Sequence, residues 1–248
     1  MLTKKEILSI AKRQLSLDYN CEASDFEKIK NTITQNQLVE GRRIYGSDGC
    51  FMKILSFYGR AIISADNQII PWAEEELENL DANWLFKYAS IKAIDRKLNE
   101  FGHEIADVHH YYLPDPKAVE IAPLFHTKWF EGEEILQFKN DERFYEAFAF
   151  DESHPDVLAV AAYAGDSIMG MAGASADSET MWQMGIDVIS EYRGKGVGTN
   201  LTVLLKQEIL KRGKLPFYGT VESHTFSKNV AIGAGFLPAW AEAYSKKL

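Results

Sequence analysis

The stretch that decides the fold is residues 185–199, which read GIDVISEYRGKGVGT. Just before and into it, Trp182, Met184 and Ile186 recur at a period of two, which predicts a strand. After it, apolar residues recur at helical spacing, at Leu201, Leu204, Leu205 and Ile209. The turn between them has three glycines in five residues, so the backbone can approach a ligand closely. Because a helix begins there, its free N–H groups and its dipole predict an anion site, typical of a phosphate or pyrophosphate.

The spacing of glycine and lysine residues in this turn limits which phosphate-containing ligands it can bind. A P-loop needs a lysine followed by serine or threonine, whereas Lys195 is followed by Gly196. A dinucleotide fingerprint needs a third glycine at the position of Thr199. The turn instead reads Arg193-x-x-Gly196-x-Gly198 after a strand. Both nucleotide motifs therefore fail, and another phosphate ligand is expected.

This turn, with the strand before it, Tyr192 and the amphipathic helix after it, resembles the pyrophosphate-binding segment of the GNAT superfamily. GNAT proteins are acyl-CoA-dependent N-acyltransferases. The order of elements expected from about His103 onward is also similar to their fold. The resemblance is strong over residues 157–244 and weaker before them. The alternative is a structural turn whose glycines only permit close packing.

The resemblance implies an α+β fold, in which helices flank a mixed, mostly antiparallel sheet. A smaller α+β N-terminal domain precedes it, as in a group of bacterial GNAT proteins without an assigned substrate. We expect the first domain to span residues 1–102 and the GNAT domain residues 103–248. The first domain contains no set of residues with evident chemistry. A lid, an acceptor-site wall, a dimer surface and a degenerate second GNAT-like half all stay open for it.

Patterns along the chain predict the other elements. Residues 3–17, 24–36 and 84–101 are expected as helices, the first two because a serine or threonine precedes a glutamate by three residues. A turn at residues 46–49 and Gly59 punctuate a small β-meander. Asp115-Pro116 reads as a helix start, with a second helical segment over residues 124–138. A hairpin over residues 157–174 and a last edge strand over residues 237–244 complete the expected order.

The charge and residue composition of the chain indicate which classes of binding partner to expect. The formal net charge of −9 argues against a nucleic-acid surface and suits cationic acceptors, although a solubilising surface explains it equally well. The two cysteines match no metal spacing, and His103, His109 and His110 lie on an expected strand without suitable neighbours. The N-terminus lacks the apolar core of a signal peptide, and no apolar run is long enough to cross a membrane. We therefore expect a cytoplasmic protein without metal, membrane or nucleic-acid partners.

The resemblance also implies the cosubstrate and its site. Acetyl-CoA is the expected acyl donor, and the backbone of Ile186, Asp187 and Val188 would pair with its pantetheine like an added strand. A strand N–H near Ile186 would stabilise the thioester oxygen as it gains charge. The residues expected to hold the pyrophosphate are Arg193, Gly194, Lys195, Gly196, Val197, Gly198 and Thr199.

The implied function is an N-acetyltransferase that moves an acetyl group from acetyl-CoA to a primary amine of a small molecule or peptide. The amine would attack directly in a ternary complex. The family's usual tyrosine acid, asparagine and glutamate base correspond here to Ala231, His224 and Met184, so no acid–base role carries over. Glu222 and His224, at the end of the strand expected from Pro216, are the remaining catalytic candidates. A non-catalytic acyl-CoA sensor or regulatory module stays open as the alternative, and a purely structural interaction protein is a third reading.

Overall fold

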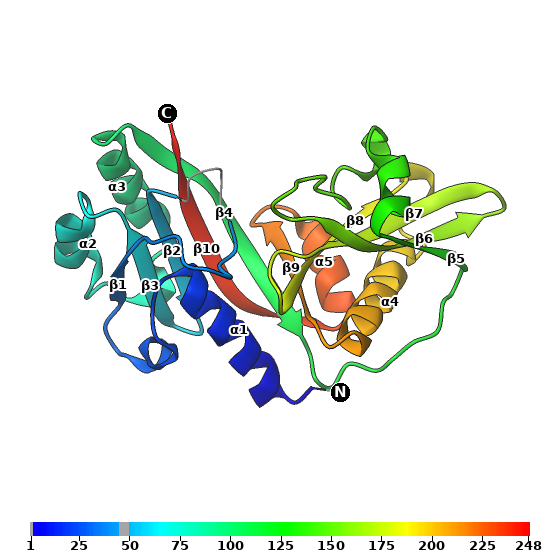
Figure 1. Ribbon diagram of the computed structural model, residues 1–248, viewed down its shortest axis with the longest axis horizontal. Helices are drawn as coiled ribbons and strands as arrows, with labels where there is room; N and C mark the ends of the chain where they lie inside the picture. The colour runs from blue at the N-terminus through cyan, green and yellow to red at the C-terminus, as the bar shows by residue number, and fades with distance from the viewer. Residues whose placement is uncertain (1, 45–49) are drawn as a thin grey trace. The chain divides into compact units, whose positions relative to one another are not determined.

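A computed structural model describes residues 2–44 and 50–248, which form two compact units (Figure 1). Unit 1 contains the chain up to Ala11 and Tyr112–Pro238, and unit 2 contains Lys12–Tyr111 and Ala239–Leu248. Three elements contribute residues to both units: α1 (Lys4–Asp18), β4 (His103–Pro114) and β10 (Phe236–Lys247). The units are therefore discontinuous in sequence. The division into domains at residues 1–102 and 103–248 stays a prediction, and the turn expected at residues 46–49 lies outside the described residues.

Unit 2 is a sheet with helices. Its strands follow the order β1-β3-β2-β10-β4, with β1 at Thr32–Gln35, β2 at Met52–Phe57 and β3 at Arg60–Ala65. The meander expected there is confirmed, because β2 and β3 form a hairpin through Tyr58 and Gly59, with φ of 47° and 76°. Helices α2 (Ile70–Leu77) and α3 (Tyr88–Asn99) carry buried residues of the same apolar cluster as β2 and β3. Two short 3-10 helices, η1 (Ala23–Glu27) and η2 (Ala82–Trp84), complete the unit.

Unit 1 contains the sheet β9-β8-β7-β6-β5. Its strands are β5 (His126–Glu131), β6 (Asp156–Ala164), β7 (Ser167–Ser175), β8 (Met181–Val188) and β9 (Leu215–Val221). Every neighbouring pair is antiparallel except β8 and β9, which run parallel. The longer helices are α4 (Val197–Lys211) and α5 (Thr225–Gly233), and the 3-10 helices are η3 (Gly132–Phe138), η4 (Glu142–Phe144) and η5 (Ser190–Tyr192). The mixed α+β class expected from the sequence is confirmed.

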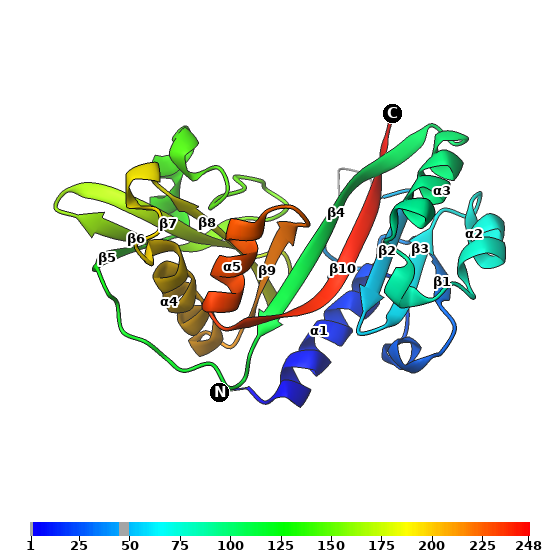
Figure 2. The same cartoon turned by 180° about the vertical axis from the view of Figure 1, so that it is seen from behind.

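Two apolar clusters cover the two faces of this sheet. Helix α4 packs against β6, β7 and β8, and Figure 2 shows it beside α5. Along β6, Leu158 and Val160 belong to the cluster under α4, whereas Ala159 and Ala161 belong to the other. Successive side chains of a strand point to opposite faces, so the second cluster lies on the face away from α4. Phenylalanines from residues 130–148 fill it.

The first expected helix is confirmed and the second is wrong. At the start of α1, the N–H of Thr3 donates to Glu6 Oε2 at 2.7 Å, and the N–H of Glu6 donates to Thr3 Oγ1 at 3.3 Å. Over residues 24–36 only the short η1 forms, and β1 follows and pairs parallel with β3. The β-branched residues 32–34 favour a strand, and pairing with the open edge of β3 stabilises it. This pairing outweighs the helix start that Ser24 and Glu27 suggest.

The helices expected after Asp115 are also wrong. The carboxylate of Asp115 accepts the N–H of Lys117 at 2.9 Å in a single turn, and the chain then runs without a helix to β5. β5 pairs with β6 from His126 to Glu131, where the sequence suggested a helix. The last strand is likewise not an edge strand, because β10 lies between β2 and β4. The errors at β1, β5 and β10 concern strands whose partners are distant in sequence.

The segment around Ala147 lies directly against β7 and β8, where two glycines make room for it. A Cβ atom at Gly173 would lie 2.1 Å from the carbonyl oxygen of Ala147, and one at Gly185 would lie 1.9 Å from that of Glu146. The carboxylate of Asp187 accepts the N–H groups of Glu146 and Ala147, both at 2.9 Å. The side chain of Asp187 therefore anchors this segment to the sheet, although burial raises its pKa.

We predict that Gly185→Ala lowers the free energy of unfolding by about 2–3 kcal/mol, because the added methyl group overlaps the backbone at Glu146. Asp187→Ala should also destabilise the protein, through the loss of two hydrogen bonds to the same segment. Either change alone releases the segment around Ala147. The double variant should therefore lose less unfolding free energy than the sum of the losses in the two single variants. Denaturant unfolding measures all three, and strictly additive losses would contradict this account.

A buried lysine links α4 to the end of α5. Lys206 is 4% exposed, its ammonium donates to the carbonyl of Ala234, and Nζ lies 5.4 Å from the centre of the Phe236 ring. Burial lowers the pKa of Lys206 to about 8, and the charge of Asp115 opposes this shift. Between that value and its unfolded pKa near 10.5, the unfolded chain binds more protons than the folded one. The contribution of Lys206 to the free energy of unfolding therefore rises as the pH increases from about 8 to 10.5.

We predict that Lys206→Met removes this rise. The unfolding free energy of the wild type relative to the variant should increase by about 2–3 kcal/mol between pH 7.5 and 10.5. Denaturant unfolding at several pH values measures the difference. Lys211→Met, at an exposed position of the same helix, is the control and should show no such change. A wild-type-to-Lys206→Met difference that is constant with pH would contradict the prediction.

Candidate active site

The parallel strands β8 and β9 separate part of the way along their length. Their register pairs run from Met181 with Leu215 to Met184 with Tyr218, and no pair follows. On its other side β8 stays paired with β7 as far as Val188. The side of β8 that faces β9 thus has no strand partner over residues 185–188. These residues include Ile186, Asp187 and Val188, which the sequence analysis assigned to the pantetheine.

The glycine turn follows directly from this open part of β8. After η5 the chain passes through Arg193, Gly194, Lys195 and Gly196, all exposed, and α4 begins at Val197. Gly194 and Gly196 have φ of 75° and 80°, and a Cβ atom at either position would meet nothing within 4 Å. Glycine is therefore used here for its backbone conformation, and the surface beside it is open. No side chain caps the first N–H groups of α4.

The basic side chains of this turn complement the helix terminus. Arg193 Nε donates to the carbonyl of Val188 at 3.1 Å, which ties the turn to the end of β8. Lys195 Nζ lies 5.2 Å from the centre of the Tyr192 ring. Uncapped N–H groups, a helix dipole and two cations in one exposed turn form a suitable environment for a diphosphate.

The remaining turn residues differ in what their side chains do. Val197 is buried in the apolar cluster under α4, so only its backbone can face a ligand. A Cβ atom at Gly198 would lie 3.2 Å from Val188 Cγ2, which shows how closely α4 packs on β8. Thr199 is half-buried and lies close to Gly233 of α5. The cofactor-binding role of the whole set stays a prediction.

The two catalytic candidates lie on the exposed turn between β9 and α5. The backbone carbonyl of Glu222 accepts the ammonium of Lys228 at 2.8 Å. His224 directly precedes α5, and its side chain does not cap the helix. Their catalytic roles also stay predictions.

Tyr218 occupies the place where β8 and β9 separate. It is 2% exposed, and its hydroxyl lies 2.9 Å from Ser227 Oγ at the start of α5. Burial raises the pKa of Tyr218 to about 12, and the charges of Glu146 and Asp187 add to this shift. The phenol therefore stays protonated around neutral pH. The sequence alone did not single out Tyr218. Its partner Ser227 lies nine residues later, and no known motif links a tyrosine and a serine at that spacing.

A second buried phenol lies near the exposed turn. The pKa of Tyr112 is raised by burial and by the charge of Glu222. By contrast, Ala231 and Met184 are buried apolar residues of the core under α4. The positions that carry an acid and a base in the resemblance are thus filled here by packing residues.

Two further features of the described residues concern ligands and membranes. Among residues 2–44 and 50–248, no cluster of three or more histidine, cysteine, aspartate or glutamate side chains is placed to hold a metal ion. In the same part of the chain, no helix combines the length and apolar character needed to span a bilayer.

The part of the chain that contains this candidate site was compared with known protein families. Residues 119–233 match the family model described as Acetyltransferase (GNAT) family. No match was found among curated proteins.

Two solved structures are similar to this chain at low sequence identity. A GCN5-related N-acetyltransferase-like protein from Streptococcus suis is 13% identical, with a TM-score of 0.51 over 97% of this chain and 100% of that one. A GCN5-related N-acetyltransferase from Kribbella flavida is 17% identical, with a TM-score of 0.47 over 85% of this chain and 89% of that one. The first of these extends the shared fold along nearly the whole chain. The family match thus places an acetyltransferase domain of the GNAT family at residues 119–233, and the Streptococcus suis structure shows that the chain has the GNAT fold.

Proposed function

We propose that the protein is an acetyl-CoA-dependent N-acetyltransferase that acts on a primary amine of a small molecule or peptide. The observation that carries the proposal is the separation of β8 from β9 next to the open glycine turn of α4. The first feature offers unpaired strand backbone, and the second offers an anion site. Acetyl-CoA has both matching parts, a pantetheine with two amides and a diphosphate.

Each part of the cofactor has a proposed contact. The pantetheine amides would pair with the backbone of Ile186, Asp187 and Val188 on the side that β9 leaves open. The diphosphate would accept the N–H groups of residues 193–199, with Arg193 and Lys195 adding charge. This arrangement would place the thioester where the strands separate, close to Tyr218.

The proposed reaction is direct attack of the neutral amine on the thioester in a ternary complex. A C–N bond forms and the C–S bond breaks, while a backbone N–H near Ile186 stabilises the oxygen as it gains charge. The amine must release one proton, and Glu222 and His224 are proposed to accept it directly or through water. The leaving thiolate is proposed to take its proton from water, while the Tyr218 hydroxyl stabilises it as a hydrogen-bond donor. The buried phenol suits this role because it stays neutral.

A second function stays open, an acyl-CoA-binding sensor or regulatory module. The observation that favours it is the buried Ala231 and Met184 at the positions of the family's acid and base. Such a protein would bind acetyl-CoA without releasing free thiol in the presence of amines. A cytoplasmic location and the lack of nucleic-acid and membrane partners are also proposed, and a homodimer stays open as an alternative to a monomer.

We predict that acetyl-CoA at a hundredfold excess over its Kd stabilises the fold by about 2.7 kcal/mol, a rise of about 5–10 °C in Tm. Gly196→Ala should remove most of this rise, because the methyl group would point into the open surface beside the helix terminus. Gly213→Ala is the matched control. Gly213 follows the C-terminus of the same helix, has φ of 73° and also meets nothing within 4 Å. Equal ligand-induced rises in both variants would contradict the assignment of the turn.

We predict that Glu222→Gln and His224→Ala each lower kcat/KM at least tenfold, with little change in acetyl-CoA affinity. Tyr218→Phe should lower kcat in the same assay, because it removes the donor and keeps the ring. The assay is thiol release with a panel of polyamines, aminoglycosides, amino acids and peptide N-termini. Glu179→Gln, at an exposed position of the same unit, is the control. Wild-type rates in all three variants from pH 6 to 9 would show that the proton path lies elsewhere.

A further inference from the structure

Glu146 has a fixed place on the face of the unit 1 sheet that lies away from α4. The neighbouring Ala147 belongs to the apolar cluster on that face, and a Cβ atom at Gly185 would lie 1.9 Å from the carbonyl oxygen of Glu146. The N–H of Glu146 donates to Asp187 Oδ2 at 2.9 Å. Gly185 is the first residue of β8 after its pairing with β9 ends at Met184. The backbone of Glu146 is therefore held against β8 at the point where β8 and β9 separate.

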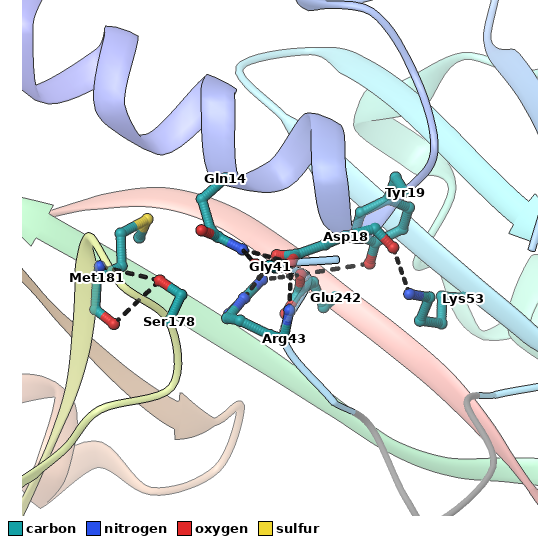
Figure 3. Close-up of polar contacts among 9 residues, drawn as sticks. All are labelled: Gln14, Asp18, Tyr19, Gly41, Arg43, Lys53, Ser178, Met181 and Glu242. Atoms are coloured by element: carbon teal, nitrogen blue, oxygen red, sulfur yellow. Dashed lines mark hydrogen bonds and ion pairs between the residues drawn. The ribbon is translucent and has the colours of Figure 1, made fainter. Parts of the chain in front are cut away.

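The side chain of Glu146 is not used by the fold. It is exposed, and in the part of the chain that the structure describes no hydrogen bond or ion pair engages its carboxylate. Figure 3 shows the contrast in unit 2, where Asp18 and Glu242 both accept hydrogen bonds from Arg43. Those carboxylates are occupied within the protein. The carboxylate of Glu146 is available to a ligand that approaches this face of the unit 1 sheet.

The charge of Glu146 acts on residues of both separating strands. Burial raises the pKa of Tyr218 on β9 to about 12, and of the charged groups Glu146 adds most to this shift. Burial also raises the pKa of Asp187 on β8, and the charge of Glu146 adds to that shift while two backbone hydrogen bonds oppose it. A carboxylate therefore lies beside the place proposed for the thioester.

A carboxylate at this place selects acceptors by their charge. The amine that attacks the thioester must be neutral, so it cannot keep an ion pair with Glu146 while it reacts. A second ammonium on the same molecule stays protonated and can keep that pair. An acceptor whose far end is a carboxylate would be repelled.

We propose that Glu146 binds a second ammonium of the acceptor, and that the preferred acceptors are therefore aliphatic diamines and polyamines. This inference rests on the proposed N-acetyltransferase function, for which Glu146 would determine specificity. Glu222 and His224 keep their proposed part in proton transfer.

Three acceptors with the same five-carbon chain test this inference: 1,5-diaminopentane, 1-aminopentane and 5-aminopentanoate. Their far ends carry a cation, no charge and an anion. In the thiol-release assay, wild-type kcat/KM should be highest with the diamine and lowest with the aminopentanoate. Glu146→Gln should lower the value for the diamine about tenfold, chiefly through KM, because one charge-assisted hydrogen bond is lost. The value for 1-aminopentane should change little, and Glu146→Lys should reverse the preference between the diamine and the aminopentanoate.

Glu142→Gln serves as the control, because Glu142 is an exposed glutamate on the same segment. This variant should keep the wild-type preference for the diamine. Two results would overturn the inference: a wild type that does not prefer the diamine, or an equal loss with all three acceptors in Glu146→Gln. An equal loss would instead assign Glu146 to proton transfer or to the fold.

Calorimetric titration of the CoA complex with 1,5-diaminopentane separates this inference from the proposed function. Suppose that the protein releases no thiol with any acceptor but binds the diamine, and that Glu146→Gln weakens this binding about tenfold. The role of Glu146 would then be supported, and the acetyltransferase proposal would be overturned. Thiol release without a preference for the diamine would do the opposite. Neither release nor binding would overturn both.

Discussion

The proposed active site depends on one constraint, the end of the parallel pairing between β8 and β9 after Met184 and Tyr218. Up to that pair, the two strands are held together as in an ordinary sheet. Beyond it, β8 keeps only β7 as a partner, and its free side is available to a ligand. The helix terminus, the glycine turn and Tyr218 all lie at or just after this point. The proposed site for an extended, anionic cofactor thus begins where this strand pair stops.

Glycine serves two different purposes around this strand. Gly173 and Gly185 are needed because another part of the backbone occupies the space of a side chain. Gly194 and Gly196 are needed for their positive φ, with open space beside them. The first pair lets the segment around Ala147 lie directly on β7 and β8. The second pair leaves the N-terminus of α4 uncovered, beside the unpaired part of β8.

Buried polar side chains have different kinds of hydrogen-bond partner in the two units. In unit 1, Tyr218 and Ser227 pair with each other, and Lys206 finds carbonyl acceptors at the end of α5. In unit 2, Arg43 finds two carboxylates, whereas one edge of Arg42 finds no acceptor among the described residues. Because burying an unpaired charge is costly, the loss of either member of a described pair should destabilise its unit.

The sequence by itself determined the local elements: the strand, glycine turn and helix over residues 181–211, the two hairpins and the capped α1. These are set by hydrogen bonds and side-chain periods within a few residues, which a sequence displays directly. Only the tertiary structure decided that β1 and β5 are strands, that β10 is an interior strand, and that Tyr218 meets Ser227. Whether a short apolar segment becomes helix or strand depends on whether a sheet edge is open beside it. That edge is supplied by residues far away in the chain, so no local pattern could have reported it.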